Sequence, residues 1–377
     1  MRKQLLQRYL PWTLVVALGC STDTTDTTNA TNATNATDAA SARDKGRIFA
    51  TVSSTGELLV LDDATHELLQ TAHVGAGPAI VIATPDEQQV FTANWGDNSA
   101  SAVDTKTLSV TNIPLADRPY VIAMSPDGSY LYAGINSTNQ IAVINTTTHA
   151  VERNISMNAL PASIIVSRDG RTLYVALLAA GLGLIGPGTL VAVDAATGAI
   201  SQPALQVGST PAWITIGKDG SRVYTLNFSS GDITVVDTAA WSVVATIPAG
   251  AGSESIIGNV TPDGSRLYVS NHGTSELIGI DTANNQIVQH IPLDGRPVGV
   301  QFDADGKYIY TTDFGTGSIN EGVGASLAYL TMGVYHGTSN GQVRVFELAT
   351  GQPVGSTVST GPGPTSVVRL RASTTTK

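Results

Sequence analysis

The chain has 377 residues, of which 13% are charged and 42% are hydrophobic, and its formal net charge is −10 at pH 7. This acidic balance argues against a nucleic-acid partner, because a negative surface repels a phosphate backbone. The only cysteine is Cys20, which excludes intramolecular disulfide bonds and a covalently attached haem c.

Residues 1–19 have the layout of a secretory signal peptide. Three basic residues precede an apolar stretch at 10–18, which is too short to span a bilayer. Cys20 follows directly, where a lipoprotein signal places the acylated residue, so we predict lipidation there. Removal of 1–19 takes away three positive charges and no negative one, which lowers the net charge to −13. We expect an extracytoplasmic protein, lipid-anchored to the cell envelope (to the outer membrane, if there is one) or periplasmic or secreted.

Residues 20–43 are rich in Ser, Thr and Asn and contain three Asn-Ala-Thr triplets. Such a segment offers almost nothing to a core, and it predicts a flexible polar tether. Asn29, Asn32 and Asn35 formally head N-glycosylation sequons. A low-complexity linker that holds the folded part away from a membrane is the favoured interpretation. Residues 373–377 are predicted to be a disordered tail.

Residues 44–372 contain one repeat unit seven times. Its most regular mark is an aromatic residue, which recurs at intervals of 42, 41, 42, 50, 44 and 42 residues. The aromatic residues are Phe49, Phe91, Tyr132, Tyr174, Tyr224, Tyr268 and Tyr310. Strand-like units with this period are typical of propeller blades. The sequence therefore predicts an all-β fold, a seven-bladed β-propeller of four-stranded antiparallel blades.

Each unit reads as four short strands. In the sixth unit the second, third and fourth strands are expected at 266–270, 277–280 and 286–291, and 297–302 begins the next blade. Asp-Gly pairs fit the hairpins between first and second strands, because Gly accepts a positive φ. They begin at Asp127, Asp169, Asp219, Asp263 and Asp305.

The ends of the repeat predict how the ring closes. The repeat begins with a second strand at 47–52 and ends with an unpartnered first-strand sequence at 364–370. Pairing of these two segments would complete the first blade and remove an open seam. We therefore expect the C-terminal strand to join the N-terminal blade.

The unit Thr-Pro-Asp-Gly-Ser-Arg-Leu-Tyr-Val-Ser-Asn at 261–271 resembles the YVTN family of bacterial propeller repeats. The closing segments Ile-Pro-Leu at 113–115 and 291–293, and Ile-Pro-Ala-Gly at 247–250, also fit that family. Blade four departs from the pattern, with Leu177 in place of the Asn. Related propellers include lactonases, streptogramin-lyase-like enzymes and dehydrogenase subunits, so the resemblance implies the fold and leaves the activity open.

Two blades carry insertions in the same hairpin. The acidic or amide residue that ends the third strand follows the aromatic by 13 residues in five blades, but by 20 in blade four and 37 in blade seven. The added segments are apolar and glycine-rich, which indicates a partner surface, a lid over the channel or packing on their own blade. The partner-loop candidates are Leu178, Leu182, Leu184, Ile185, Leu327, Tyr329 and Tyr335.

The loops on that face carry unusual residues where sister blades have small ones. Asn94, Asn136, Asn227 and Asn271 are expected to cap the turns that follow the second strands. Arginine and aromatic side chains beside them would suit an anionic or carbohydrate-like ligand. The ligand-binding candidates are Trp95, Arg118, Tyr120, Trp213, Phe228, His272 and Arg296.

The weak catalytic candidates are His272, Glu254, Glu276 and Asp313, which are expected on neighbouring blades and could act as an acid/base or metal set. The sequence has no motif for a metal site or a nucleophile, so no cofactor and no metal are predicted.

The leading hypothesis is a non-catalytic, monomeric binding module for an envelope protein, a glycan or a small ligand on the insert-bearing face. A hydrolase or lyase of the lactonase or streptogramin-lyase type is one alternative. A propeller subunit of a periplasmic redox complex, with the cofactor on a partner chain, is another. The membrane is expected to be contacted only through the lipid anchor.

Overall fold

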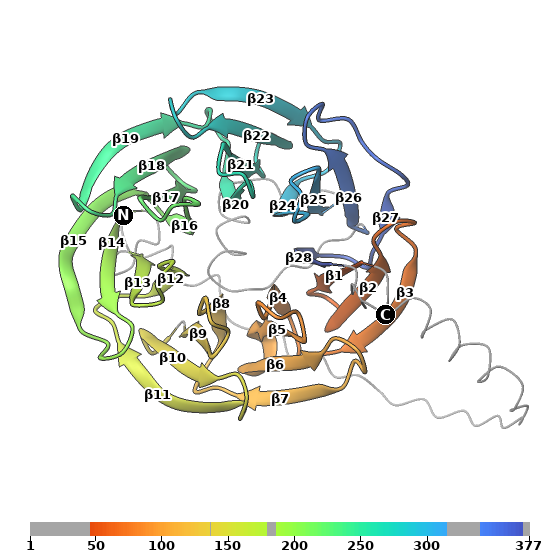
Figure 1. Cartoon of the computed structure of the whole chain (residues 1–377), viewed down its shortest axis with the longest axis horizontal. Helices are drawn as coiled ribbons and strands as arrows, with labels where there is room; N and C mark the ends of the chain where they lie inside the picture. Colours follow the sequence, from red (N-terminus) through yellow and green to blue (C-terminus); the bar gives the residue numbers. More distant parts are fainter. Residues whose placement is uncertain (1–45, 136, 179–185, 315–339, 372–377) are drawn as a thin grey trace, which may run out of the picture. The chain divides into compact units, whose positions relative to one another are not determined.

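The computed structural model describes residues 46–135, 137–178, 186–314 and 340–371. These residues form 28 strands and one short 3-10 helix, η1 (Trp95–Asp97). The strands make seven four-stranded antiparallel sheets, arranged as a ring in Figure 1. The predicted seven-bladed propeller is therefore confirmed.

The blades are numbered along the chain, and each is given from its innermost to its outermost strand. Blade one contains β28 (Pro364–Leu370), β1 (Arg47–Val52), β2 (Glu57–Asp62) and β3 (Leu68–His73). Blade two contains β4 (Pro78–Ala83), β5 (Gln89–Asn94), β6 (Ser99–Asp104) and β7 (Val110–Pro114). Blade three contains β8 (Pro119–Met124), β9 (Tyr130–Ile135), β10 (Gln140–Asn145) and β11 (Ala150–Ser156). Blade four contains β12 (Pro161–Val166), β13 (Thr172–Leu177), β14 (Pro187–Asp194) and β15 (Ile200–Ser209). Blade five contains β16 (Pro211–Ile216), β17 (Arg222–Asn227), β18 (Asp232–Asp237) and β19 (Ser242–Pro248). Blade six contains β20 (Ser255–Val260), β21 (Arg266–Asn271), β22 (Glu276–Asp281) and β23 (Ile287–Pro292). Blade seven contains β24 (Pro297–Phe302), β25 (Tyr308–Asp313), β26 (Gln342–Glu347) and β27 (Val358–Ser359).

The innermost strands close the ring. Each contacts the innermost strands of both neighbouring blades, and β24 contacts β28 to complete the circle. The C-terminal β28 pairs antiparallel with β1, with Phe49 opposite Val368. The predicted pairing of the two ends of the repeat is thus confirmed, and it removes the open sheet edge that a seven-blade ring would otherwise expose.

An ion pair reinforces this closure. Arg369 on β28 donates from Nε and Nη2 to Oδ2 of Asp63, at 3.0 and 2.6 Å. The hydroxyl of Tyr310 on β25 donates to the other carboxylate oxygen, 2.6 Å away. Because Tyr310 belongs to blade seven and Asp63 to blade one, these bonds join the last blade to the first.

Apolar side chains fill the space between adjacent blades. The recurring aromatic residue is buried in every blade, from Phe49 at 0% to Tyr174 at 8% exposed. Between blades three and four, for example, Tyr132 and Val121 pack against Ile164 and Val175. Burial of one such side chain stabilises a fold by about 1.5–3 kcal/mol, so the repeat at this position also fixes the register of each blade.

The Asp-Gly turns join first to second strands, as predicted. At the turn of blade six, Gly264 has φ +85° and its Cα lies close to Lys218, where an added Cβ would come within 2.9 Å of the lysine Cβ. The Asp263 carboxylate accepts from the Thr261 and Ser265 hydroxyls at 2.5 and 2.7 Å. These bonds lower the pKa of Asp263 to about 2, because they favour its charged form.

Both insertions fall in hairpins between second and third strands, β13–β14 and β25–β26. Residues 179–185 and 315–339 of these hairpins lie outside the described residues, as do the predicted signal peptide, Cys20, the predicted tether and the predicted tail. In blade four, β14 has 8 residues and pairs with a β15 of 10 residues. In the described ranges no helix is long and apolar enough to cross a membrane.

Candidate functional site

Two sets of loops share one face of the propeller, which we call the insert-bearing face. They are the loops that lead into the first strands and the hairpins between second and third strands. Backbone hydrogen bonds join them: the Trp95 N–H donates to the Gly77 carbonyl (3.1 Å), and the Phe228 N–H donates to the Thr210 carbonyl (2.9 Å). This face brings together the predicted ligand-binding loops and both insertion sites.

A ring of buried side chains lies just below that face, at the position that follows each second strand. Its large members are Trp95, Leu178, Phe228, His272 and Phe314, none of them more than 4% exposed. Each donates its backbone N–H to a carbonyl of the preceding loop. The structure therefore places Trp95, Phe228 and His272 in the interior, although they were expected to contact a ligand, and it buries Leu178 likewise.

His272 is a core residue of this ring. Its imidazole packs edge-to-face on Phe314, with ring centroids 5.4 Å apart, and Nδ1 lies 3.3 Å from the Pro297 carbonyl oxygen. Burial, and then the positive charge of Arg296, lower the pKa of His272 to about 3. A general base works best with a pKa near the working pH, so a buried imidazole with this pKa is poorly suited to acid/base catalysis at neutral pH.

The other catalytic candidates are held in separate contacts. Glu276 accepts from Nδ1 of His290 at 2.8 Å, and not from His272. Asp313 is fully buried and forms an ion pair with Arg344. Among the described residues, no group of three or more His, Cys, Asp or Glu side chains could hold a metal ion. The four predicted catalytic residues do not form one constellation.

Glu254 differs from the other three. Its backbone adopts a left-handed conformation, with φ +48°, and its carbonyl accepts from the His272 N–H at 3.4 Å. The side chain is half-buried, and Oε2 has no hydrogen-bond partner in the described part of the chain. The same is true of the hydroxyl of the adjacent Ser253. Buried polar atoms are normally paired, so these two oxygens are among the few exceptions in the described residues.

The amide residues at the ends of second strands have the structural role that was expected for them. Asn94 donates to the hydroxyls of Ser99 and Ser101, at 3.0 and 2.8 Å. Asn227 donates to Asp232 Oδ1 at 2.6 Å, and Asn271 donates to a backbone carbonyl at 3.1 Å. Asn136 lies outside the described residues. These side chains hold their hairpins in place.

Arg118, Tyr120, Trp213 and Arg296 are the predicted ligand-binding residues that reach the surface. Arg118 is exposed, and its guanidinium lies over the ring of Trp95, 5.7 Å from the centroid. Tyr120 packs edge-to-face with that indole, with ring centroids 5.7 Å apart. Trp213 is half-buried and donates Nε1–H to the Gly258 carbonyl at 2.9 Å. Neither Arg118 nor Arg296 forms an ion pair with a described carboxylate, so both charges are available to an acidic group.

Apolar side chains narrow the central channel. The lining residues come from the innermost strands, where a register shift in blades two to five leaves one extra residue near the strand start. The lining residues are Ala79, Ile80, Tyr120, Val121, Ala162, Ala212, Trp213, Ile256 and Ile257. The cavity that they enclose measures about 20 Å³, room for about one water molecule. It cannot hold a sugar or a cofactor.

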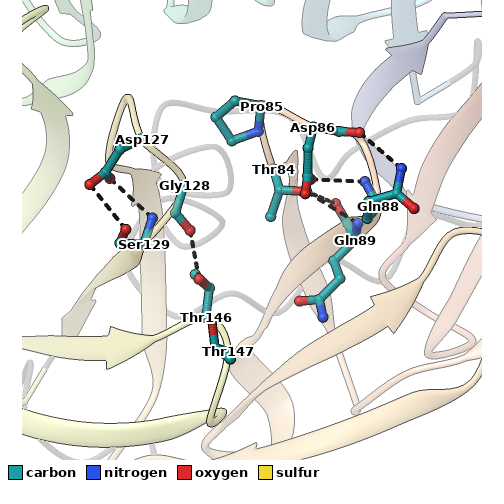
Figure 2. Close-up of a pocket in the computed structure, with 10 residues that line it drawn as sticks. All are labelled: Thr84, Pro85, Asp86, Gln88, Gln89, Asp127, Gly128, Ser129, Thr146 and Thr147. Carbon is teal, nitrogen blue, oxygen red and sulfur yellow. Dashed lines mark hydrogen bonds between the residues drawn. The ribbon is translucent and has the colours of Figure 1, made fainter.

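Larger grooves lie on the opposite face, which we call the turn face because the Asp-Gly hairpins form it. Figure 2 shows a groove of about 380 Å³ between blades two and three, with Asp86 on one rim and Asp127 on the other. A second groove of about 460 Å³ lies between blades three and four. Both fall within the usual size range of small-molecule sites, about 300–1,000 Å³.

The residues of the second groove, chiefly Arg153 and Arg168, are not among those predicted from the sequence. A signal was present, because Arg168 takes the turn position that is Pro85 in blade two and Pro126 in blade three. The predicted ligand-binding residues all belong to the opposite, insert-bearing face.

Comparison with known proteins finds a distant relative by sequence and solved structures with a similar fold. No known protein-family profile matches the chain. It is 25% identical over 138 residues to antigen Lp49 of Leptospira interrogans serogroup Icterohaemorrhagiae serovar copenhageni, a match that covers 33% of this chain and 30% of that protein. The chain thus spans about a third of the length of this curated relative.

Three solved propellers have a similar fold. Kuenenia stuttgartiensis hydrazine synthase is 20% identical with a TM-score of 0.64, over 80% of this chain and 98% of that one. A Bacteroides uniformis protein considered to be a 6-phosphogluconolactonase is 14% identical with a TM-score of 0.66, over 87% and 100%. The dihydro-heme d1 dehydrogenase NirN is 14% identical with a TM-score of 0.60, over 87% and 75%. At these identities the likeness concerns the fold alone.

Proposed function

We propose that this chain is a YVTN-type propeller that acts as a non-catalytic binding module, held at the cell envelope by a lipid on Cys20. Its insert-bearing face binds a macromolecular partner, an envelope protein or a glycan. The regular repeat between 44 and 372 supports the YVTN assignment, and the signal layout of 1–19 supports a location at the cell envelope.

One observation supports this proposal most directly. Three of the candidate catalytic side chains make contacts within the fold, whereas two arginines on the same face have no described carboxylate partner. His272 is in the core, Glu276 bonds to His290, and Asp313 bonds to Arg344. Arg118 and Arg296, by contrast, have no described carboxylate partner, and guanidinium groups bind carboxylates or phosphates well.

The size of the channel favours a partner that lies across the loops. A cavity of about 20 Å³ leaves no room for a substrate in the central channel. The hydrolase and redox-subunit alternatives are supported by likeness of fold, which by itself does not carry an activity.

The experiment that tests this proposal is a crosslinking pull-down from native membranes. The intact chain is compared with a variant in which short Gly/Ser linkers replace 179–185 and 315–339. These bounds spare Leu178, which packs in the core, and Pro187, which begins β14. We expect the intact chain to recover a partner that the variant loses.

Two further variants locate the surface. Arg118→Ala combined with Arg296→Ala should recover less of the same partner, whereas Arg171→Ala, which removes an exposed arginine on the turn face, should recover it fully. Equal recovery by every folded variant would overturn the proposal. Lactone hydrolysis by the intact chain that His272→Phe abolishes would do so as well.

A further inference from the structure

Four of the seven blades share one hydrogen bond on the turn face, and the other three lack its donor, because they have Asp63, Ala195 and Leu348 at the position of the threonine. In blades two, three, five and six, a threonine after the third strand donates its hydroxyl to a carbonyl of the Asp-Gly turn or its equivalent. The bonds are 2.8 Å from Thr105 to Glu87, 2.6 Å from Thr146 to Gly128, 2.8 Å from Thr238 to Gly220 and 2.7 Å from Thr282 to Gly264. Blade four has Ala195 at this position, which provides no hydroxyl.

The groove of about 460 Å³ between blades three and four lies at this site. Its polar lining comes from both blades: Asp127, Tyr130 and Arg153 from blade three, and Arg168 and Asp169 from blade four. Ala195 forms part of the wall. The sister groove of about 380 Å³ is lined by Thr146 at the equivalent position, so what sets this groove apart is the alanine together with two arginines.

Backbone carbonyls fix both guanidinium groups. Arg153 donates from Nη2 to the Ala195 carbonyl. Arg168 donates to carbonyls of the neighbouring blade five, from Nη2 to Ile216 and Gly217, both at 3.2 Å, and from Nε to Gly217 at 3.3 Å. Neither arginine forms an ion pair with a carboxylate of the described chain. Since a guanidinium has five N–H donors, each retains donors for an anionic group in the groove.

Two carboxylates and a tyrosine complete the lining. Asp127 accepts from the Ser125 hydroxyl at 2.6 Å, and Asp169 accepts from the Ser167 hydroxyl at 2.6 Å. Each carboxylate still has acceptor capacity for a ligand hydroxyl, because an ionised carboxylate offers about four acceptor sites. Tyr130 is half-buried and adds an apolar ring face to the wall.

The matching groove between blades two and three provides a natural comparison. Figure 2 shows it lined by Thr, Pro, Asp, Gln, Gly and Ser side chains, and no arginine or lysine is among them. The position of Tyr130 is Gln89 there, and the position of Arg168 is Pro126. Two grooves at equivalent places thus differ in their cations and in the aromatic ring.

From this difference we infer that the groove between blades three and four binds an acidic sugar, a uronic acid or an oligomer of one. The sugar carboxylate pairs with Arg153 and Arg168, its hydroxyls donate to Asp127 and Asp169, and its ring lies against Tyr130. This site is separate from the insert-bearing face and does not depend on the function proposed for it.

The test is calorimetric titration of the full chain with trigalacturonate, with neutral maltotriose and inorganic phosphate as comparison ligands. We expect one saturable site for trigalacturonate and binding at least tenfold weaker for the other two. Arg153→Gln or Arg168→Gln should each weaken binding about tenfold, as expected for the loss of a charge-assisted contact. Arg171→Gln, which removes an arginine outside the groove, should bind as the native chain does.

A variant that keeps every charge separates a loss of binding from a loss of folding. Ala195→Thr restores the residue of the sister blades and places a side chain in the groove. It should bind trigalacturonate several-fold more weakly while its melting temperature is unchanged or raised. No saturable binding by the native chain, equal binding by all the variants, or phosphate binding as tight as that of trigalacturonate would each overturn the inference.

Discussion

At the scale of single residues, the burial of His272 is explained by its position in the repeat and not by a role in catalysis. It occupies the position that is Phe228 in blade five and Phe314 in blade seven, and all three side chains are buried. The polarity of the imidazole is accommodated by the Pro297 carbonyl, 3.3 Å from Nδ1. A histidine can thus take a phenylalanine's place in a core, provided that it stays neutral.

This burial predicts a pH dependence of stability. Folding lowers the pKa of His272 from 6.5 to about 3, so between these values the unfolded chain binds a proton that the native chain does not. The contribution of the neutral His272 to the free energy of unfolding is therefore complete above pH 6.5. It decreases by about 1.4 kcal/mol per pH unit as the pH falls toward 3. Urea unfolding of His272→Phe at pH 4.5, 5.5 and 7.0 should show a flatter dependence than the native chain. Parallel curves for the two proteins would contradict the burial argument.

At the scale of elements, each blade depends on short-range bonds that the repeat carries with it. The hydroxyl of Thr282 donates to the Gly264 carbonyl at 2.7 Å and so ties the start of the third–fourth hairpin to the Asp-Gly turn of its blade. We expect Thr282→Val, which keeps the shape and removes the hydroxyl, to lower the free energy of unfolding by about 1 kcal/mol. Thr282→Ser should lose less than half of that. Urea denaturation measures both, and a larger loss for Thr282→Ser than for Thr282→Val would show that the methyl group matters more than the hydroxyl.

The elements were also the most predictable part of the molecule. The Asp-Gly turns, the strand that holds the aromatic and the ring-closing strand follow from local sequence, because glycine geometry and alternating burial act within a few residues. The site was less predictable. Burial of Trp95, Phe228 and His272 depends on packing between blades, and the partners of Glu276 and Asp313, which are His290 and Arg344, lie 14 and 31 residues further along the chain.

At the scale of the whole molecule, the ring is held closed by one strand from the far end of the chain. β28 pairs with β1, and Arg369 on β28 pairs with Asp63 of the same blade, while Tyr310 reaches that carboxylate from blade seven. A chain without β28 would expose the edge of β1 and leave Asp63 without its cation, so cooperativity should fail as a whole and not blade by blade.

Deletion of 362–377 should therefore abolish the single cooperative melting transition, as followed by circular dichroism. Deletion of 372–377 alone is the matched control, because it spares β28, and it should melt like the full chain. A protein truncated at 361 that unfolds with the native midpoint and steepness would refute the closure account.

The measurement that tests the central claim most directly is site-specific photo-crosslinking in native membranes. A benzoylphenylalanine is placed at position 118 on the insert-bearing face or at position 171 on the turn face. If the insert-bearing face binds the partner, a discrete crosslinked product should form from position 118 and not from position 171. A product from position 171 alone, or equal products from both positions, would contradict the claim that this face is the binding surface.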